Sequence, residues 1–153
     1  MPNTYTQIYF QIVFTVRDRD CMIREKNREM LQKYITGIIQ KRGHKLLSIY
    51  CMPDHVHIFV GYNPSGLLPD LIRDVKTGST IFINQERWFK TKFYWQEGYG
   101  AFSYSRSHIS AVCKYIENQP IHHKKKTFRD EYLEFLRKFD VDFDERYLFE
   151  FFN

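Results

Sequence analysis

The segment from Tyr5 to Val16 alternates apolar and polar side chains with a period of two residues. The apolar residues are Ile8, Phe10, Ile12, Phe14 and Val16. The residues that alternate with them include Tyr9, Gln11 and Thr15. This is the period of a β-strand with one buried face. The chain is therefore predicted to open with a strand, and the segments that follow must cover its apolar face.

A helix and two strands are predicted next. Residues 24–42 carry apolar side chains at helical spacing, and Gly43 follows as a stop signal. Residues 44–51 and 55–62 have the composition of two short strands. The segment Met52-Pro53-Asp54 between them favours a turn, so a hairpin is predicted.

The second half of the chain completes a recognisable order of elements. A second helix should run from Leu68 into the low eighties, with Gly78 as a point where it could break. Residues 93–104, which include Gly98 and Gly100, predict a loop entering a bent last strand, and residues 105–119 predict a third helix that ends near Pro120. The order β-α-β-β-α-β followed by helices predicts an α+β, ferredoxin-like fold. Its antiparallel sheet would have helices on one face, and a helical tail would follow.

The last part of the chain differs in composition from the rest. The length of 153 residues fits one domain. Residues 1–126 hold 19 Lys and Arg against 10 Asp and Glu, whereas residues 127–153 hold 4 against 8 and are rich in Phe and Tyr. We expect a domain over 1–126 and an acidic, aromatic extension over 127–153 that packs on the body or on a partner chain.

Charge and aromatic content suggest a class of partner. The net charge is +5 and 18% of the residues are aromatic, a combination that suits single-stranded nucleic acid. A basic protein whose aromatic side chains fill its core would have the same composition. The chain lacks an apolar run of about 18 residues and a signal peptide, and its three cysteines form no Cys-x-x-Cys pair. We expect a cytoplasmic protein without a membrane partner.

Two histidines are candidates for metal binding. In His55-Val56-His57, strand alternation places both imidazoles on one face, and imidazole is a good ligand for divalent metals. Asp54 beside them could orient one ring or could simply belong to the turn. His-x-His is a short pattern, and histidines that only satisfy hydrogen bonds would also produce it.

A tyrosine and a glutamine form a second candidate pair. Tyr115 and Gln119 lie one helical turn apart and flank the apolar stripe of the third predicted helix. They could present a phenolic nucleophile close to an amide oxygen that completes a metal site. A boundary Tyr-Gln pair without function has the same spacing.

Three separated motifs agree on one family. They are Cys51-Met-Pro-Asp-His-Val-His-Ile-Phe-Val60, Trp95-Gln-Glu-Gly-Tyr-Gly-Ala-Phe102 and Tyr115-Ile-Glu-Asn-Gln-Pro-Ile-His-His123. In this order they resemble the HUH-type single-tyrosine transposases of the smallest bacterial insertion sequences and their REP-associated relatives. The resemblance covers about residues 4–126 in motif order and includes part of the tail.

The resemblance implies an enzyme that cleaves and rejoins single-stranded DNA with hairpin-bearing ends through a 5′-phosphotyrosine. Tyr115 matches the nucleophile, and His55, His57 and Gln119 match the ligands of Mg²⁺ or Mn²⁺. It also implies a homodimer in which Tyr115 of one chain serves the histidines of the other. A bacterial, nucleoid-associated protein without a nucleotide cofactor is expected. Pro120 directly after Gln119 makes the aim of the amide less certain.

Further basic residues are candidates for DNA contacts, although each can also be explained as ordinary surface. They are Arg17, Arg19, Arg73, Lys76, His108, His122, His123, Lys124, Lys125 and Lys126. The alternative function is a non-catalytic or domesticated module that binds single-stranded nucleic acid on an aromatic sheet. Such a module would not explain why His55, His57, Tyr115 and Gln119 occur together.

Overall fold

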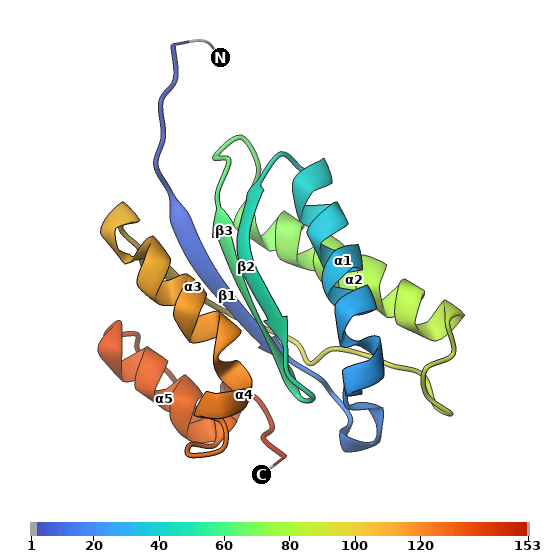
Figure 1. The fold of residues 1–153 in the computed structure, drawn as a ribbon. Helices are drawn as coiled ribbons and strands as arrows, with labels where there is room; N and C mark the ends of the chain where they lie inside the picture. The colour runs from blue at the N-terminus through green and yellow to red at the C-terminus, as the bar shows by residue number, and fades with distance from the viewer. Residues whose placement is uncertain (1–2, 153) are drawn as a thin grey trace.

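The computed structural model of the chain describes residues 3–152, and its centre is a four-stranded antiparallel sheet (Figure 1). The strands are β1 (Tyr9–Thr15), β2 (Lys45–Cys51), β3 (His55–Gly61) and β4 (Gly100–Tyr104). They lie in the order β2-β3-β1-β4, and every neighbouring pair is antiparallel. The predicted α+β, ferredoxin-like fold is confirmed.

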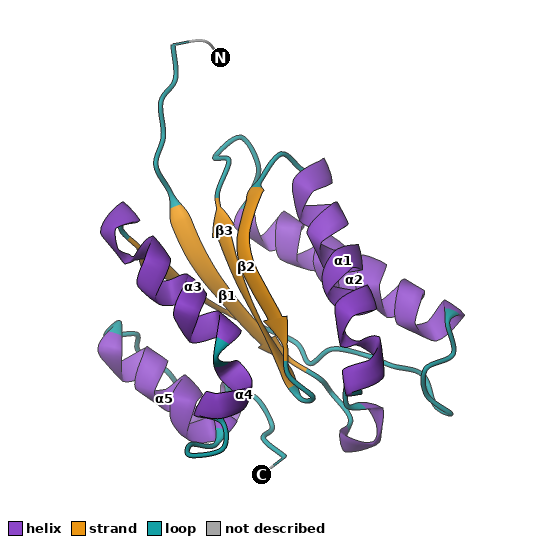
Figure 2. Cartoon of the chain, viewed as in Figure 1, coloured by secondary structure: helices purple, strands orange, loops and turns teal. Residues whose placement is uncertain are grey.

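Helices cover both faces of this sheet. The connecting helices α1 (Glu25–Lys41) and α2 (Leu68–Gln85) lie on one face, as predicted for the ferredoxin-like arrangement. The C-terminal helices α3 (Ile109–Glu117), α4 (Gln119–His122) and α5 (Phe128–Lys138) lie on the other (Figure 2). The central strand β3 is accordingly buried on both sides from His55 to Val60. Within residues 3–152, no helix has the length and apolarity needed to cross a membrane.

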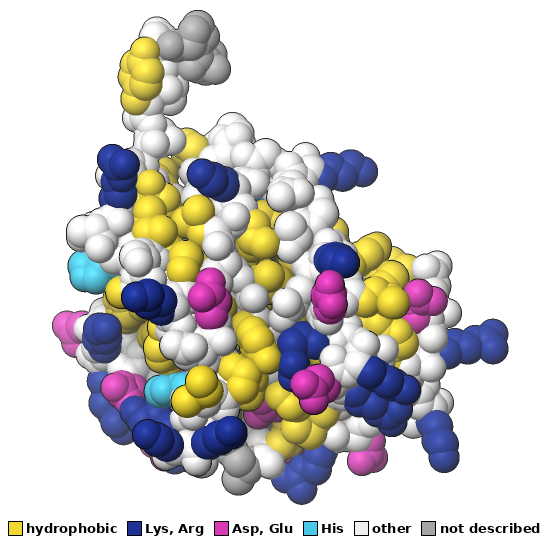
Figure 3. All heavy atoms as spheres, viewed as in Figure 1, with side chains coloured by type: hydrophobic (Ala, Val, Ile, Leu, Met, Phe, Trp, Pro, Cys, Tyr) yellow, Lys and Arg dark blue, Asp and Glu magenta, His cyan; other side chains and the backbone are white. Residues whose placement is uncertain are grey.

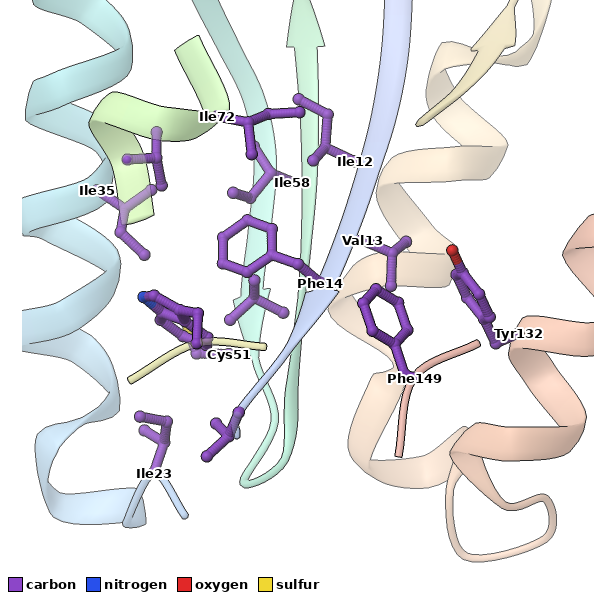
Figure 4. Packing of buried hydrophobic residues seen from close by; sticks show 14 of the residues in the cluster. Ile12, Val13, Phe14, Ile23, Ile35, Cys51, Ile58, Ile72, Tyr132 and Phe149 are labelled. Carbon is purple, nitrogen blue, oxygen red and sulfur yellow. The ribbon is translucent and has the colours of Figure 1, made fainter. Parts of the chain in front are cut away.

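The core consists of two layers, one on each side of the sheet (Figure 4). Ile12 and Phe14 of β1 point toward α1 and α2, where they meet Ile35 and Ile72. Val13, between them in sequence, points to the opposite side, toward Tyr132 and Phe149 of the C-terminal segment. Adjacent residues of β1 therefore serve different layers, because strand side chains alternate between faces.

Some details of the predicted strands and helices differ from the structure. The first strand begins at Tyr9 rather than near Tyr5. The predicted helix over 105–119 is a 3-10 turn (Arg106–His108), then α3, then the separate helix α4. Helix α3 ends near Pro120, at Glu117, and Pro120 itself lies in the first turn of α4, where its missing N–H costs nothing. Gly78 does not interrupt α2; a Cβ there would lie 2.8 Å from Ile38 of α1, so the glycine permits close packing of the two helices.

The segment after Lys126 packs against the sheet. Thr127 caps α5 by accepting a hydrogen bond from the backbone N–H of Asp130. Several apolar side chains of α5 are buried: Phe128, Tyr132, Leu133, Phe135 and Leu136. Tyr132 comes so close to Gly100 of β4 that a Cβ at Gly100 would lie 2.7 Å from the tyrosine hydroxyl. The glycine therefore lets α5 approach the sheet.

Candidate active site

Strand β3 directs two histidines into the layer between the sheet and the C-terminal helices. Side-chain alternation places His55, His57 and Phe59 on this face and Val56 and Ile58 on the other. The two imidazoles are 1% and 0% exposed, and their ring centroids lie 5.1 Å apart. The predicted histidine pair is therefore enclosed within the protein.

Hydrogen bonds on the outer side of each ring fix the two histidines. Nδ1 of His55 lies 2.7 Å from Oδ1 of Asp54, and Nδ1 of His57 lies 2.9 Å from Nε2 of Gln11. Burial raises the pKa of the Asp54 carboxyl, but the hydrogen bond and charge of His55 outweigh it and hold that pKa below its usual value. With Nδ1 engaged in this way, Nε2 of each ring is left to face the site.

Helix α3 and the start of α4 supply the tyrosine and the glutamine. Val112 and Ile116 pack α3 on Phe59, which leaves Tyr115 at the edge of the apolar face. The Tyr115 ring centroid lies 6.0 Å from that of His57 in the same chain. Gln119 is fully buried, and its Oε1 lies 3.2 Å from Nε2 of His55. The break between α3 and α4 therefore does not carry the amide away from the histidines.

Helix α5 adds a residue that sequence reasoning missed, Glu131. Its side chain is 2% exposed, and Oε1 lies 3.1 Å from Nε2 of His57 and 3.6 Å from Nε2 of His55. Its Oε2 accepts hydrogen bonds from Nε2 of Gln119, at 2.9 Å, and from the hydroxyl of Tyr115. The sequence held one signal: Glu131 interrupts the apolar stripe at helical spacing from Phe128 and Phe135.

Two histidines that were predicted to contact DNA lie at this centre. Nε2 of His123 is 3.1 Å from Oε1 of Glu131, and Nε2 of His122 is 3.3 Å from the hydroxyl of Tyr115. His55, His57, His123 and Glu131 each offer a ligand atom, and these atoms all lie within 4.8 Å of one another. Buried imidazoles with a carboxylate suit a divalent ion, so this His-rich cluster can bind a metal.

The carboxylate of Glu131 dominates the electrostatics of the site. Burial opposes its ionisation, but the charge of His57 and hydrogen bonds from His123 and His57 outweigh burial and hold the pKa of Glu131 below its usual value. Burial and the negative charge of Glu131 together raise the pKa of Tyr115. Burial lowers the pKa of His57, and the charge of Glu131 only partly offsets it. Tyr115 is thus a neutral phenol at neutral pH.

A groove between α3 and α5 reaches the tyrosine from outside. Its cavity measures about 270 Å³, and its lining includes Gln11, Tyr104, His108, Tyr115 and Lys138. His108 is exposed and its Nδ1 lies 2.9 Å from Oγ of Ser105. The groove provides a path by which an extended strand could bring a phosphate to Tyr115.

The remaining basic candidates are spread over other surfaces. Lys76 donates hydrogen bonds to the backbone carbonyls of Gln96 and Gly98, at 2.8 and 2.6 Å, and burial lowers its pKa to about 8. Arg73 pairs with Asp70 and Asp74 on its own helix.

Arg17 and Arg19 lie over aromatic rings. The Arg17 guanidinium is 5.4 Å from the Tyr94 ring centroid, and that of Arg19 is 5.7 Å from the Phe152 ring centroid. Lys124 and Lys125 are exposed after α4, whereas Lys126 pairs with Glu134. In the view of Figure 3, Lys and Arg side chains lie over the lower part of the molecule, with Asp and Glu between some of them.

Comparisons with known proteins give one consistent result. The family model described as "Transposase IS200 like" matches residues 4–119. The ISDra2 transposase TnpA of Deinococcus radiodurans is 24% identical over 119 residues, which cover 74% of this chain and 84% of the relative.

Two solved structures share the fold. One, assigned as a transposase of Deinococcus radiodurans R1, is 21% identical with a TM-score of 0.57, and the match covers 76% of this chain and 94% of that one. The other, a REP-associated tyrosine transposase bound to a REP hairpin, is 15% identical with a TM-score of 0.60, and the match covers 79% of this chain and 72% of that one.

Proposed function

This chain belongs to the IS200-like transposase family, and from that premise we propose that it cleaves and rejoins single-stranded DNA through a covalent bond to Tyr115. Family members are DNA-cleaving and strand-transferring enzymes, so the chain is a transposase that acts on DNA. The observation that carries the specific proposal is the convergence of Tyr115 with His55, His57 and Gln119 in one buried centre.

In the proposed nucleophilic step, Tyr115 is the attacking group. Its oxygen attacks phosphorus, the bond between phosphorus and the 3′ oxygen breaks, and the products are a 5′-phosphotyrosine and a 3′-hydroxyl. The phenolic proton has two acceptors at hand, Oε2 of Glu131 and Nε2 of His122, and the leaving oxygen takes a proton in turn. The phosphotyrosine bond conserves the energy of the broken phosphodiester bond for rejoining, so no nucleotide cofactor is needed.

A divalent ion, Mg²⁺ or Mn²⁺, is proposed at His55, His57 and Gln119. When bound, it would draw electron density from a non-bridging phosphate oxygen. The residues fit such an ion because their donors are buried and because Asp54 holds the outer nitrogen of His55.

The remaining parts of the proposal concern partners and organisation. We propose hairpin-bearing single-stranded DNA as the substrate, as in the relative solved with a REP hairpin, and a homodimer as the active unit. We propose residues 1–126 as the transposase domain and 127–153 as an extension, since the family match ends at residue 119. Arg17, Arg19, Lys124 and Lys125 remain candidates for backbone contacts. Action on chromosomal DNA would place the protein at the bacterial nucleoid.

The covalent intermediate tests the proposed function directly. The protein is incubated with single-stranded oligonucleotides that carry the hairpin-flanked ends found beside its coding region, in the presence of Mn²⁺. We expect a protein–DNA adduct that survives denaturation, is absent in Tyr115→Phe and persists in Tyr147→Phe, a control at an exposed tyrosine. An adduct of normal yield in Tyr115→Phe would exclude Tyr115 as the nucleophile.

A further inference from the structure

We propose that His123 and Glu131 are metal ligands together with His55 and His57, so that the C-terminal helix α5 is part of the metal centre. This inference rests on the proposed function, because it concerns the same ion. Glu131 lies beyond residue 119, where the family match ends. A metal ligand at Glu131 would therefore give the C-terminal extension of this chain a chemical role.

The distances around Oε1 of Glu131 are those of ligands that share an ion. This oxygen lies 3.1 Å from Nε2 of His57, 3.1 Å from Nε2 of His123 and 3.6 Å from Nε2 of His55. Metal–ligand bonds of about 2.1 Å that meet at tetrahedral or octahedral angles place neighbouring ligand atoms roughly 3.0–3.4 Å apart. The carboxylate oxygen from α5 thus lies at or near this separation from the imidazoles of β3 and of the turn after α4, and all four ligand atoms lie within 4.8 Å of one another.

All three imidazoles are oriented in the same way. Nδ1 of each ring is held from outside: by Oδ1 of Asp54 at 2.7 Å for His55, by Gln11 at 2.9 Å for His57, and by the backbone carbonyl of Lys126 at 2.8 Å for His123. Nε2 of each ring is left facing Glu131. Metal-binding histidines are oriented by such outer partners. In the structure the amide nitrogen of Gln11 faces Nδ1 of His57. A metal on Nε2 of His57 requires the ring proton on Nδ1. Gln11 must therefore turn its amide so that its oxygen accepts that proton in a hydrogen bond.

The charge balance also favours a cation. The carboxylate of Glu131 is 2% exposed, and its ion-pair partners within residues 3–152 are histidines, with no Lys or Arg among them. A buried carboxylate requires compensation by positive charge or metal coordination. Histidines can supply the charge only when protonated, whereas a divalent ion supplies it while the imidazoles stay neutral.

The donor set indicates the class of metal. Three imidazole nitrogens and one carboxylate oxygen suit first-row transition ions such as Mn²⁺, Co²⁺ or Zn²⁺ better than Mg²⁺, which prefers oxygen ligands. Gln119 fits the same centre as a further donor. Its amide nitrogen donates to Oε2 of Glu131 at 2.9 Å, which leaves Oε1 directed at His55.

Metal affinity measured without DNA tests the inference. The metal-free full-length protein is titrated with Co²⁺, and visible absorption reports both affinity and coordination. We expect Glu131→Gln and His123→Gln each to weaken Co²⁺ binding by at least about tenfold and to change the spectrum, since even outer partners of ligands contribute 10–100-fold. Glu134→Gln, on the exposed face of the same helix, and His108→Gln are matched controls that should bind as the wild type does.

A second measurement uses the unaltered protein, in case a variant fails to fold. Histidine ¹⁵N spectra are recorded with and without Zn²⁺, and coordination should shift the Nε2 resonances of His55, His57 and His123 together. Shifts confined to His55 and His57, or wild-type Co²⁺ affinity in Glu131→Gln and His123→Gln, would overturn the inference while leaving the proposed function intact. If the wild-type protein, saturated with metal, formed no covalent adduct with DNA through Tyr115, that result would instead refute the proposed function.

Discussion

The hydroxyl of Tyr115 donates a hydrogen bond to Oε2 of Glu131, 16 residues further along the chain. The bond links the proposed nucleophile on α3 to a helix that lies outside the family-matched residues. Because burial and the negative charge of Glu131 both favour the protonated phenol, they raise the pKa of Tyr115. The reactivity of the tyrosine is therefore coupled to the C-terminal segment.

Removing the charge of Glu131 should lower the pKa of Tyr115. Burial would still act in Glu131→Gln, so the pKa should fall toward its ordinary value without reaching it. Tyrosine Cζ shifts followed by NMR against pH, with Tyr115→Phe for assignment, measure this directly. Glu134→Gln removes a charge with a smaller effect on Tyr115 and should change the pKa less. An unchanged pKa in Glu131→Gln would contradict the coupling.

The pairing of His123 with Glu131 should make stability depend on pH in the metal-free protein. Burial lowers the pKa of His123, but the hydrogen bond and charge of Glu131 outweigh it, so the pKa is raised above its usual 6.5. A raised histidine pKa stabilises the fold fully below pH 6.5, and this contribution is lost as the pH rises through the folded-state pKa. The Tm lost in His123→Ala should thus be larger at pH 6 than at pH 8.5, and an equal loss at both would show that the pair carries no charge-dependent stability.

Truncating Phe135 should destabilise the whole protein. Phe135 belongs to α5, and its buried ring stacks on Phe102 of β4 with 5.1 Å between the ring centroids. Phe135→Ala should cost about 3–5 kcal/mol of unfolding free energy in denaturant titrations, the range for large core side chains. Tyr147→Ala, at a residue 81% exposed in the same segment, should cost little. Equal stability of the two variants would show that the C-terminal segment is only an appendage.

Mixing two inactive variants decides whether Tyr115 acts within its own chain. The resemblance implied action in the partner chain. However, the break between α3 and α4 does not release α3, and a single chain brings Tyr115 beside its own His57. We therefore expect that a mixture of Tyr115→Phe and His57→Ala, with subunit exchange verified, forms no adduct. Recovery of a substantial fraction of wild-type cleavage would establish the exchanged arrangement.

Two lysines among the DNA-contact candidates should behave differently. Lys76→Met removes two hydrogen bonds to backbone carbonyls and should cost about 1–3 kcal/mol of stability. Lys125→Met, at an exposed position after α4, should leave Tm unchanged and reduce the salt dependence of binding to single-stranded DNA. Thermal unfolding and binding at several salt concentrations separate these effects. The reverse pattern would assign Lys76 to DNA.

The order of elements and part of the site could be predicted from sequence. The alternation in β1 and β3 and the apolar stripes of α1, α2 and α3 are local patterns, so the ferredoxin-like sheet and the common face of His55 and His57 follow from residues close in sequence. The position of Pro120 could not be predicted in this way. Proline is compatible both with the end of one helix and with the first turn of the next, and only packing decided between them.

The tertiary structure alone decided the surroundings of the histidines. Glu131 is separated from His55 and His57 by 76 and 74 residues, and its segment was expected only to pack on the body or on a partner chain. His123 was predicted as a candidate for a DNA contact, yet the turn after α4 directs its Nε2 to the same carboxylate. Sequence patterns report which face of an element is buried, but not which partner covers it. A polar residue on a buried face therefore acquires its role only when the elements pack and its hydrogen bonds must be satisfied.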